Sequence, residues 1–130
     1  VYEPGTLLSV NYKDGKEIGR YSLETAGAYE RINIVREDTA REDGLIYLEL
    51  NLADAAGRTV TSLRKKLTIK VEGGRLMGMG SADPKTEDLY PSGSCFTWNG
   101  RAIAVIRKED KETSVTVCDD EGRTTKLLII

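Results

Sequence analysis

Closely spaced glycines give the stretch Leu76–Asp88, LMGMGSADPKTED, the strongest suggestion of chemistry in the chain. Glycine loops can bring backbone N–H groups close to a phosphate, but they need a helix directly after them, and P-loops also need a lysine followed by serine or threonine. Neither feature follows Gly78 and Gly80. We therefore expect a strand over Arg75–Met79, whose glycines permit close packing or a bulge, and then a turn fixed by Asp83-Pro84.

Acid–base and nucleophilic chemistry has little support in the sequence. The 130 residues include no histidine, which excludes a Ser-His-Asp or Cys-His triad and any histidine-containing metal site. The 21 acidic residues could hide a pair of carboxylates of the kind that glycosidases use, but they fall mostly in predicted loops and exposed strand positions. Their spacing gives no reason to pair any two of them. We predict no catalytic residue, no metal site and no cofactor.

The two cysteines, Cys95 and Cys118, carry no spacing signature. They could form a disulfide if the protein is exported, and a zinc site from two cysteines alone is a weaker alternative. We favour the more ordinary interpretation, in which both are small, half-buried residues on strands.

Aromatic side chains offer a different chemistry, because an exposed ring can stack on a sugar. Trp98 and Phe96 are the only tryptophan and the only phenylalanine, and they alternate in CFTWNG, so we expect them on one face. Large apolar side chains are more often buried, and we favour the core for both. Trp98 and Tyr90 are nevertheless our candidate carbohydrate contacts, and Tyr29 is a weaker one.

The elements that must hold these residues show a period of two almost everywhere. In LIYLELNLAD, residues 45–54, every second side chain is aliphatic, which is typical of a half-buried antiparallel strand. RINIV and LTIKVEG repeat this alternation, and TSVTVC and TKLLII complete the set. The nearly continuous apolar run in RAIAVIR, residues 101–107, predicts a central strand that is covered on both faces. The side chains expected to point inward from the alternating strands are Ile32, Ile34, Ile46, Leu48, Leu50, Leu52, Leu67, Ile69 and Val71.

Residues that tolerate a positive φ separate these runs. Glu72-Gly73-Gly74 is expected to close a hairpin, and Asp54–Gly57 and Asp119–Gly122 are expected to form turns. The charged stretches Lys108–Glu112 and Arg36–Asp43 are typical of solvated loops. No segment carries a convincing apolar stripe with a period of 3.6 residues. We therefore predict an all-β antiparallel sandwich.

The N-terminal residues form a separate unit in this pattern. Leu8, Val10 and Tyr12 alternate with other residues, and Asp14-Gly15 then provides a turn. Residues 18–23 return, which predicts a two-stranded hairpin. A lone hairpin is at best marginally stable, and unpaired strand edges recruit other strands. We expect this hairpin to pack against its own sandwich or to pair with a second copy of the chain.

Composition limits the size and the partners of the molecule. A chain of 130 residues is by default one compact domain with a real core. The net charge is −2 and charges of both signs are interspersed, which argues against a nucleic-acid surface. No apolar run approaches the roughly 20 residues that span a bilayer, so we expect no membrane partner. The opening residues, 1–5, are typical of the interior of a longer protein, and we treat the chain as a fragment of one.

Short motifs in a fixed order give the chain a resemblance to a known family. The first are a Tyr-x-Pro-Gly-x-Leu strand, an Asp-Gly-Lys turn and a Thr-Ala-Gly exit. An Asp-x-x-Gly turn, a Val-Glu-Gly and a Gly-x-Gly-x-x-Asp-Pro loop follow. The matching residues are Tyr2, Pro4, Gly5, Leu7, Asp14–Lys16, Thr25–Gly27, Asp54–Gly57, Val71–Gly73, Gly78–Pro84, Glu87 and Asn99–Arg101. Over nearly its whole length, the chain resembles the C-terminal immunoglobulin-like domains of family 2 glycoside hydrolases, the β-galactosidase-like enzymes.

This resemblance implies an immunoglobulin-like sandwich of about seven strands over residues 28–130. Residues 1–27 would be the closing hairpin of a preceding, truncated immunoglobulin-like domain. The catalytic glutamates of the family lie in an upstream barrel domain, so no catalytic residue is carried over to this chain. We therefore expect the piece to be inactive by itself.

The resemblance also implies a role in carbohydrate metabolism. The chain would be a non-catalytic accessory domain that braces the barrel or forms contacts with other domains or subunits. The parent would be a bacterial glycosidase, periplasmic or secreted, that acts on β-linked sugars. Two alternatives remain open. One is a carbohydrate-binding module that works through exposed aromatics such as Trp98. The other is an immunoglobulin-like repeat of a surface adhesin, a likeness of fold alone.

Overall fold

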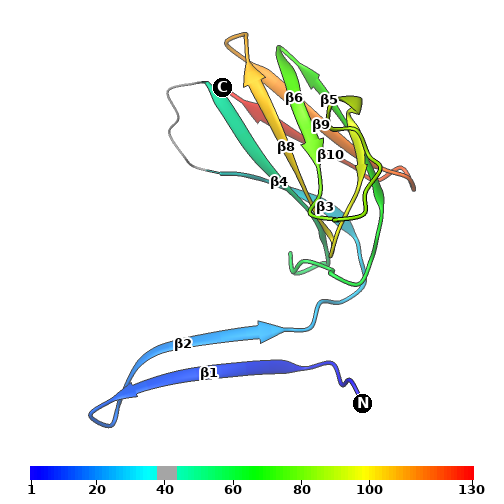
Figure 1. The fold of residues 1–130 in the computed structure, drawn as a ribbon. Coiled ribbons are helices and arrows are strands. Elements are labelled where there is room, and N and C mark those ends of the chain that lie inside the picture. The colour runs from blue at the N-terminus through cyan, green and yellow to red at the C-terminus, as the bar shows by residue number, and fades with distance from the viewer. Residues whose placement is uncertain (38–43) are drawn as a thin grey trace.

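The computed structural model describes residues 1–37 and 44–130, and Figure 1 shows a β-sandwich with a hairpin joined to its lower end. The hairpin consists of β1 (Thr6–Lys13) and β2 (Lys16–Glu24). The sandwich strands are β3 (Arg31–Arg36), β4 (Leu45–Ala53), β5 (Lys66–Glu72), β6 (Gly74–Gly80), β7 (Ser94–Phe96), β8 (Arg101–Lys108), β9 (Thr113–Asp119) and β10 (Thr124–Ile129). Among the described residues, helical geometry is confined to the 3-10 turn η1 (Tyr90–Ser92), and no helix is long and apolar enough to cross a bilayer.

Strands β3 to β10 form two antiparallel sheets of four strands each. The first sheet has the order β3-β4-β8-β6, and the second sheet has the order β10-β9-β5-β7. The predicted all-β, antiparallel, immunoglobulin-like sandwich is confirmed, although it has eight strands where about seven were expected. Of the predicted loop Arg36–Asp43, Arg36 ends β3, and residues 38–43 lie outside the described part of the chain.

The core lies between the two sheets and follows the predicted alternation. Leu48, Leu50 and Leu52 of β4 are fully buried and belong to one cluster with Val115 and Val117 of β9. Burying one such side chain contributes about 1.5–3 kcal/mol, so these facing strands supply much of the driving force for folding. Of the other side chains that were expected to point inward, Ile32, Ile46, Leu67 and Ile69 are buried, and Ile34 and Val71 are partly buried.

Strand β8 is central in the first sheet, as its apolar run predicted, but only one of its faces is covered. Ala102, Ala104 and Ile106 point into the core, whereas Ile103 on the opposite face is 42% exposed. The expectation of a strand covered on both faces is therefore wrong. The sandwich has two layers, and no further layer of the described residues lies over this outer face.

The chain changes sheets at Gly73, where a hairpin was predicted. Strand β5 pairs with β7 and β9 in the second sheet, whereas β6 pairs with β8 in the first. Gly73 has a φ of +72°, and a Cβ at this position would lie 2.2 Å from the carbonyl oxygen of Glu112. The Gly73 carbonyl accepts a hydrogen bond from Oγ1 of Thr113 at 2.7 Å. The predicted turn exists, but it joins two layers instead of two neighbours in one sheet.

The hairpin forms with the predicted strands and turn. Asp14 and Gly15 take φ values of 50° and 74°, and β1 and β2 pair only with each other among the described strands. Figure 1 shows both strands extending away from the sandwich. The expectation that the hairpin packs against its own sandwich is therefore wrong, because the linker, residues 25–30, directs it outward. Pairing with a second copy stays a prediction.

Candidate functional site on the outer sheet face and at the hairpin joint

The glycines of β6 make room for an aromatic ring. Gly80 pairs with Ile103 of β8, and a Cβ at Gly80 would lie 2.7 Å from Cε1 of Tyr90. The pairing of β6 with β8 also shifts in register between Leu76 and Gly78. The predicted close packing and bulge are thus confirmed. A loop and the η1 turn follow β6, so the glycines do not open a helix of the kind that binds phosphate.

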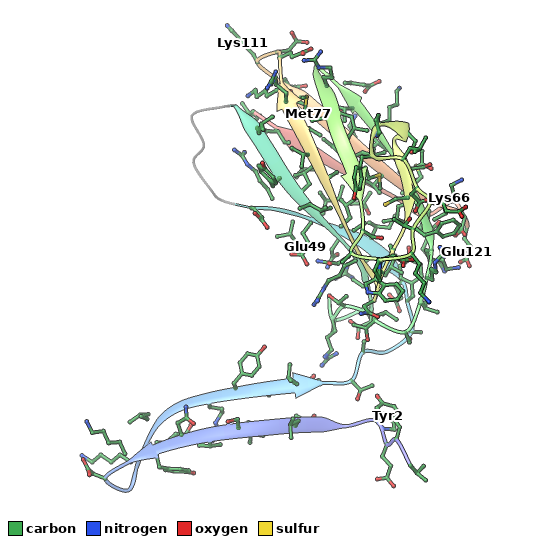
Figure 2. The ribbon with its side chains drawn as sticks, viewed as in Figure 1. Tyr2, Glu49, Lys66, Met77, Lys111 and Glu121 are labelled. Atoms are coloured by element: carbon green, nitrogen blue, oxygen red, sulfur yellow. The ribbon has the colours of Figure 1, made fainter. Side chains whose placement is uncertain are left out.

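Tyr90 forms one wall of the first of two grooves on the outer face of the first sheet. Its side chain packs over Gly80 and is still 64% exposed. The first groove has a volume of about 510 Å³. Its lining is mainly apolar and includes Met77, Gly78, Gly80, Tyr90, Ile103 and Val105. Met77 is labelled in Figure 2.

Trp98 points to solvent, and the expectation that it fills the core is wrong. Thr97 takes the inward position instead, since it is 1% exposed while Trp98 is 40% exposed. The backbone N–H of Thr97 donates to the carbonyl of Lys65 at 2.9 Å, and its Oγ1 accepts from the Lys65 N–H at 3.0 Å. Phe96, the other expected core aromatic, lies half-buried with the guanidinium of Arg64 at 3.8 Å from its ring centre.

The second groove adjoins Trp98 and has a volume of about 470 Å³. A tight turn joins Trp98 to Arg101 through two backbone hydrogen bonds of 2.9 and 3.0 Å. The guanidinium of Arg101 lies 3.6 Å from the carboxylate of Glu49, which Figure 2 shows projecting from the sandwich. The lining includes Glu37, Glu49, Ser81, Trp98, Asn99, Arg101 and Ile103.

The structure brings both candidate carbohydrate contacts to one face of the sandwich. Tyr90 lines the first groove and Trp98 the second, and the two grooves share Ser81 and Ile103. The two aromatic rings therefore flank a continuous surface on the outer face of the first sheet.

Both cysteine thiols are free. Cys95 lies opposite Leu67 and Cys118 opposite Thr68, so strand β5 separates them within the second sheet. The favoured interpretation as small strand residues is confirmed, and the disulfide is not formed. Burial raises the pKa of the Cys95 thiol to about 11, which keeps it protonated and unreactive at neutral pH. No three side chains of metal-binding type gather within residues 1–37 and 44–130.

Asp54 closes the predicted turn after β4 and also holds the linker that leads from the hairpin. Its Oδ1 accepts hydrogen bonds from the backbone N–H groups of Ala56 at 3.0 Å and Arg58 at 2.8 Å. Its Oδ2 accepts one from the N–H of Gly27 at 2.8 Å. These bonds, led by the one from Gly27, hold the pKa of Asp54 below its usual value. One oxygen thus serves the turn and the other serves the linker.

A second turn repeats this arrangement at the end of β9. Oδ1 of Asp119 accepts from the N–H groups of Glu121 at 2.9 Å and Arg123 at 2.8 Å, and its Oδ2 accepts from the Tyr29 hydroxyl at 2.8 Å. Burial opposes ionisation of Asp119, yet these hydrogen bonds hold its pKa below the usual value. Burial and the bond to Asp119 raise the pKa of Tyr29. The Tyr29 hydroxyl is thus engaged in the joint rather than available to a sugar.

The contacts of Asp54 and Asp119 with the linker were not predicted from the sequence, although a signal for them is present. Both segments were predicted as turns, and the two turns share a sequence pattern. The pattern Asp-x-x-Gly-Arg occurs twice, as DAAGR at residues 54–58 and as DDEGR at residues 119–123. A repeated pattern of this kind indicates the same local hydrogen bonding at both places.

Comparisons with known proteins support the resemblance. A family model described as glycoside hydrolase family 2 C-terminal domain 5 matches residues 35–126. No match was found among curated protein sequences. A solved glycosyl hydrolase family 2 member from Bacteroides cellulosilyticus is 28% identical with a TM-score of 0.87, over 99% of this chain and 19% of that chain.

Two more distant structures show the same fold. A β-glycosidase from Bacteroides vulgatus is 22% identical with a TM-score of 0.86, over 98% of this chain and 17% of that chain. A β-glucuronidase from Parabacteroides merdae is 18% identical with a TM-score of 0.64, over 99% of this chain and 17% of that chain. The chain thus spans less than a fifth of each of these proteins, and the similar region includes the hairpin as well as the sandwich.

Proposed function

Because the chain belongs to the C-terminal domain 5 family of glycoside hydrolase family 2, we propose that it is a non-catalytic accessory domain anchored in a longer glycosidase through its hairpin. In this role residues 1–27, which contain the hairpin, complete the preceding unit. The sandwich, residues 28–130, braces the catalytic barrel or contacts other domains or subunits.

The observation that carries this proposal is the exposed apolar surface of the hairpin. Leu7 lies opposite Leu23, and these side chains are 70% and 55% exposed. The other large apolar side chains exposed on β1 and β2 are Leu8, Tyr12, Ile18 and Tyr21. Leu7 and Leu8 are consecutive in β1, so the apolar side chains occupy both faces of the hairpin. A two-stranded sheet with apolar side chains in solvent on both faces is at best marginally stable, which favours a partner that covers them. The preceding part of a longer chain would cover these faces and pair with the free edges.

The proposal also covers, in less detail, the substrate and the cellular compartment of the longer protein. We propose a β-linked sugar as the substrate of the longer protein, since the similar structures include a β-glycosidase and a β-glucuronidase. A β-galactoside is one candidate within this class. We also propose a periplasmic or secreted bacterial protein, which follows from the sequence resemblance.

The test compares two Leu→Asp substitutions in a longer protein, in which this chain is expressed together with the segment that its gene encodes upstream. Leu23 and Leu128 are similarly accessible in the chain alone, at 55% and 49%, but only Leu23 lies on the hairpin. Leu23→Asp is expected to lower the free energy of unfolding by about 2–3 kcal/mol, because it buries an unpaired charge in a domain contact. Leu128→Asp is expected to change it by less than about 0.5 kcal/mol.

Urea unfolding of the joined protein measures both effects. If the two substitutions lower the free energy of unfolding by the same amount, the hairpin is not covered by the preceding unit and the proposal is wrong. Light scattering of the chain alone tests the alternative that a second copy of the chain covers the hairpin. This would appear as a dimer that Leu23→Asp dissociates.

Carbohydrate binding is a second candidate function, and the composition of the second groove favours it. The ring of Trp98 offers an apolar platform, and Asn99, Arg101 and Glu49 supply hydrogen-bonding groups beside it. A sugar ring has an apolar face and polar edges, so it suits a groove of this kind. Because Glu37 and Glu49 outnumber the one guanidinium among the described residues of the lining, we propose a neutral sugar. For the adhesin alternative, fold likeness remains the only support.

A further inference from the structure

The linker between the hairpin and the sandwich is held by one turn from each sheet. Asp54 directly follows β4 of the first sheet, and Asp119 ends β9 of the second sheet. Their second carboxylate oxygens bind Gly27 and Tyr29, which are separated by a single residue. We propose that the two turns act together as a clamp that fixes the orientation of the hairpin relative to the sandwich. The inference that this clamp also orients a preceding unit of a longer protein rests on the proposed function. The clamp itself involves only residues that the structure describes.

The two turns have the same internal structure. The N–H of Asp54 donates to the carbonyl of Arg58 at 3.0 Å, and the same bond of 3.0 Å joins the first and last residues of the turn at 119–123. Gly57 and Gly122 occupy equivalent positions with φ values of +84° and +89°. Since each turn satisfies its own backbone N–H groups with one carboxylate oxygen, the other oxygen can accept from the linker. In the second turn this oxygen also accepts from Nη1 of Arg123 at 3.3 Å.

Contacts on both sides extend the clamp along the linker. On the N-terminal side of Gly27, the carboxylate of Glu24 pairs with the guanidinium of Arg58, which belongs to the first turn. On the C-terminal side of Tyr29, the N–H of Glu30 donates to the carbonyl of Ala53 at 2.9 Å. The guanidinium of Arg123, from the second turn, lies 4.6 Å from the ring centre of Tyr29. Successive anchors are therefore separated by no more than two residues, which leaves little length for a hinge.

Two substitutions remove the linker contacts while sparing the turns. In Asp54→Asn, the remaining oxygen can still accept from the turn, but the new NH₂ group faces the N–H of Gly27, donor against donor. Tyr29→Phe keeps the ring that packs against Arg123 and loses only the hydroxyl that donates to Asp119.

Asp83→Asn is the matched control. Asp83 forms the turn predicted after β6, where its Oδ1 accepts from the N–H of Lys85 at 2.9 Å, and neither residue belongs to the linker. The measurement is the NMR order parameter of the backbone amides at residues 26–30 in the full chain, with the sandwich strands as the internal reference.

The natural chain and Asp83→Asn are expected to give linker order parameters of about 0.85, as in the strands. The double variant Asp54→Asn/Tyr29→Phe is expected to fall below about 0.6 in the linker while the strands stay unchanged. A rigid linker in the double variant would overturn the clamp, and so would a natural chain whose linker is already flexible.

If the double variant does not fold, Tyr29→Phe alone decides. A lower order parameter at residues 28–30 supports the clamp, and an unchanged value overturns it. Because this experiment uses the chain alone, its failure is distinguishable from failure of the Leu23→Asp test in the joined protein.

Discussion

Trp98 is the only tryptophan of the chain, so its fluorescence reports directly on the second groove. Titration with a neutral β-1,4-linked galactotetraose is expected to change its emission in a saturable way. Arg101→Ala is expected to weaken binding at least tenfold, because it removes a hydrogen-bond donor beside the ring. Arg75 provides the matched control, since its side chain is as exposed as that of Arg101, at 59% and 58%, but lies outside the groove.

Two outcomes would contradict carbohydrate binding at Trp98. One is the absence of a saturable change with the tetrasaccharide. The other is an equal effect of Arg75→Ala and Arg101→Ala. A glucuronic acid oligosaccharide of the same length is expected to bind more weakly, because Glu37 and Glu49 repel its carboxylates.

Two elements, the Asp-x-x-Gly-Arg turns, link the stability of the fold to pH. The pKa values of Asp54 and Asp119 are lowered in the folded chain, while an unfolded aspartate titrates near 3.9. Stability from these groups is therefore fully present above about pH 5 and is lost as the pH falls through the folded pKa values. We expect the urea midpoint to drop between about pH 5 and pH 2.

The variant Asp54→Asn/Asp119→Asn is expected to show a shallower drop over the same range, because neither side chain titrates. Asp83→Asn serves again as the control and should keep the slope of the natural chain. Parallel curves for all three proteins would show that the two turns do not carry the pH dependence.

Most strands of the sandwich were predictable from sequence because one face is buried, so alternation in β4 or β5 reports its orientation directly. The sheet to which a strand belongs was not predictable in the same way. The turn at Gly73 has the same local sequence requirements whether β6 pairs with β5 or crosses to β8. That choice depends on pairing between strands far apart in sequence, which a local pattern does not contain.

The candidate site was predictable in part, for a similar reason. The aromatic candidates Trp98 and Tyr90 could be identified by type, but the exposure of Trp98 depends on Thr97 being tied to Lys65, 32 residues away. Neither the partners of Trp98 in the groove nor the linker contacts of Asp54 are encoded in a local motif. Only the repeated turn sequence indicated that two distant segments share one structure.

The whole molecule has two parts, and neither is expected to hydrolyse a glycoside by itself. The isolated chain should release no nitrophenol from nitrophenyl β-galactoside, β-glucoside or β-glucuronide above a protein-free control. Glycosidases need two carboxylates placed on either side of the bond that breaks. Because Glu37 and Glu49 line the same groove, turnover that Glu49→Gln abolishes would contradict a non-catalytic role.

The bond between Tyr29 and Asp119 joins residues that are 90 positions apart, and this separation has a consequence for synthesis on the ribosome. The hairpin and its linker leave the ribosome long before β9 does, and domains generally begin to fold in the order in which they emerge. The first turn, at residues 54–58, can hold Gly27 while the second sheet is still incomplete. The second anchor closes only after Asp119, at the end of β9, has been made. The relative placement of the two parts is therefore fixed later in synthesis than the pairing of β1 with β2.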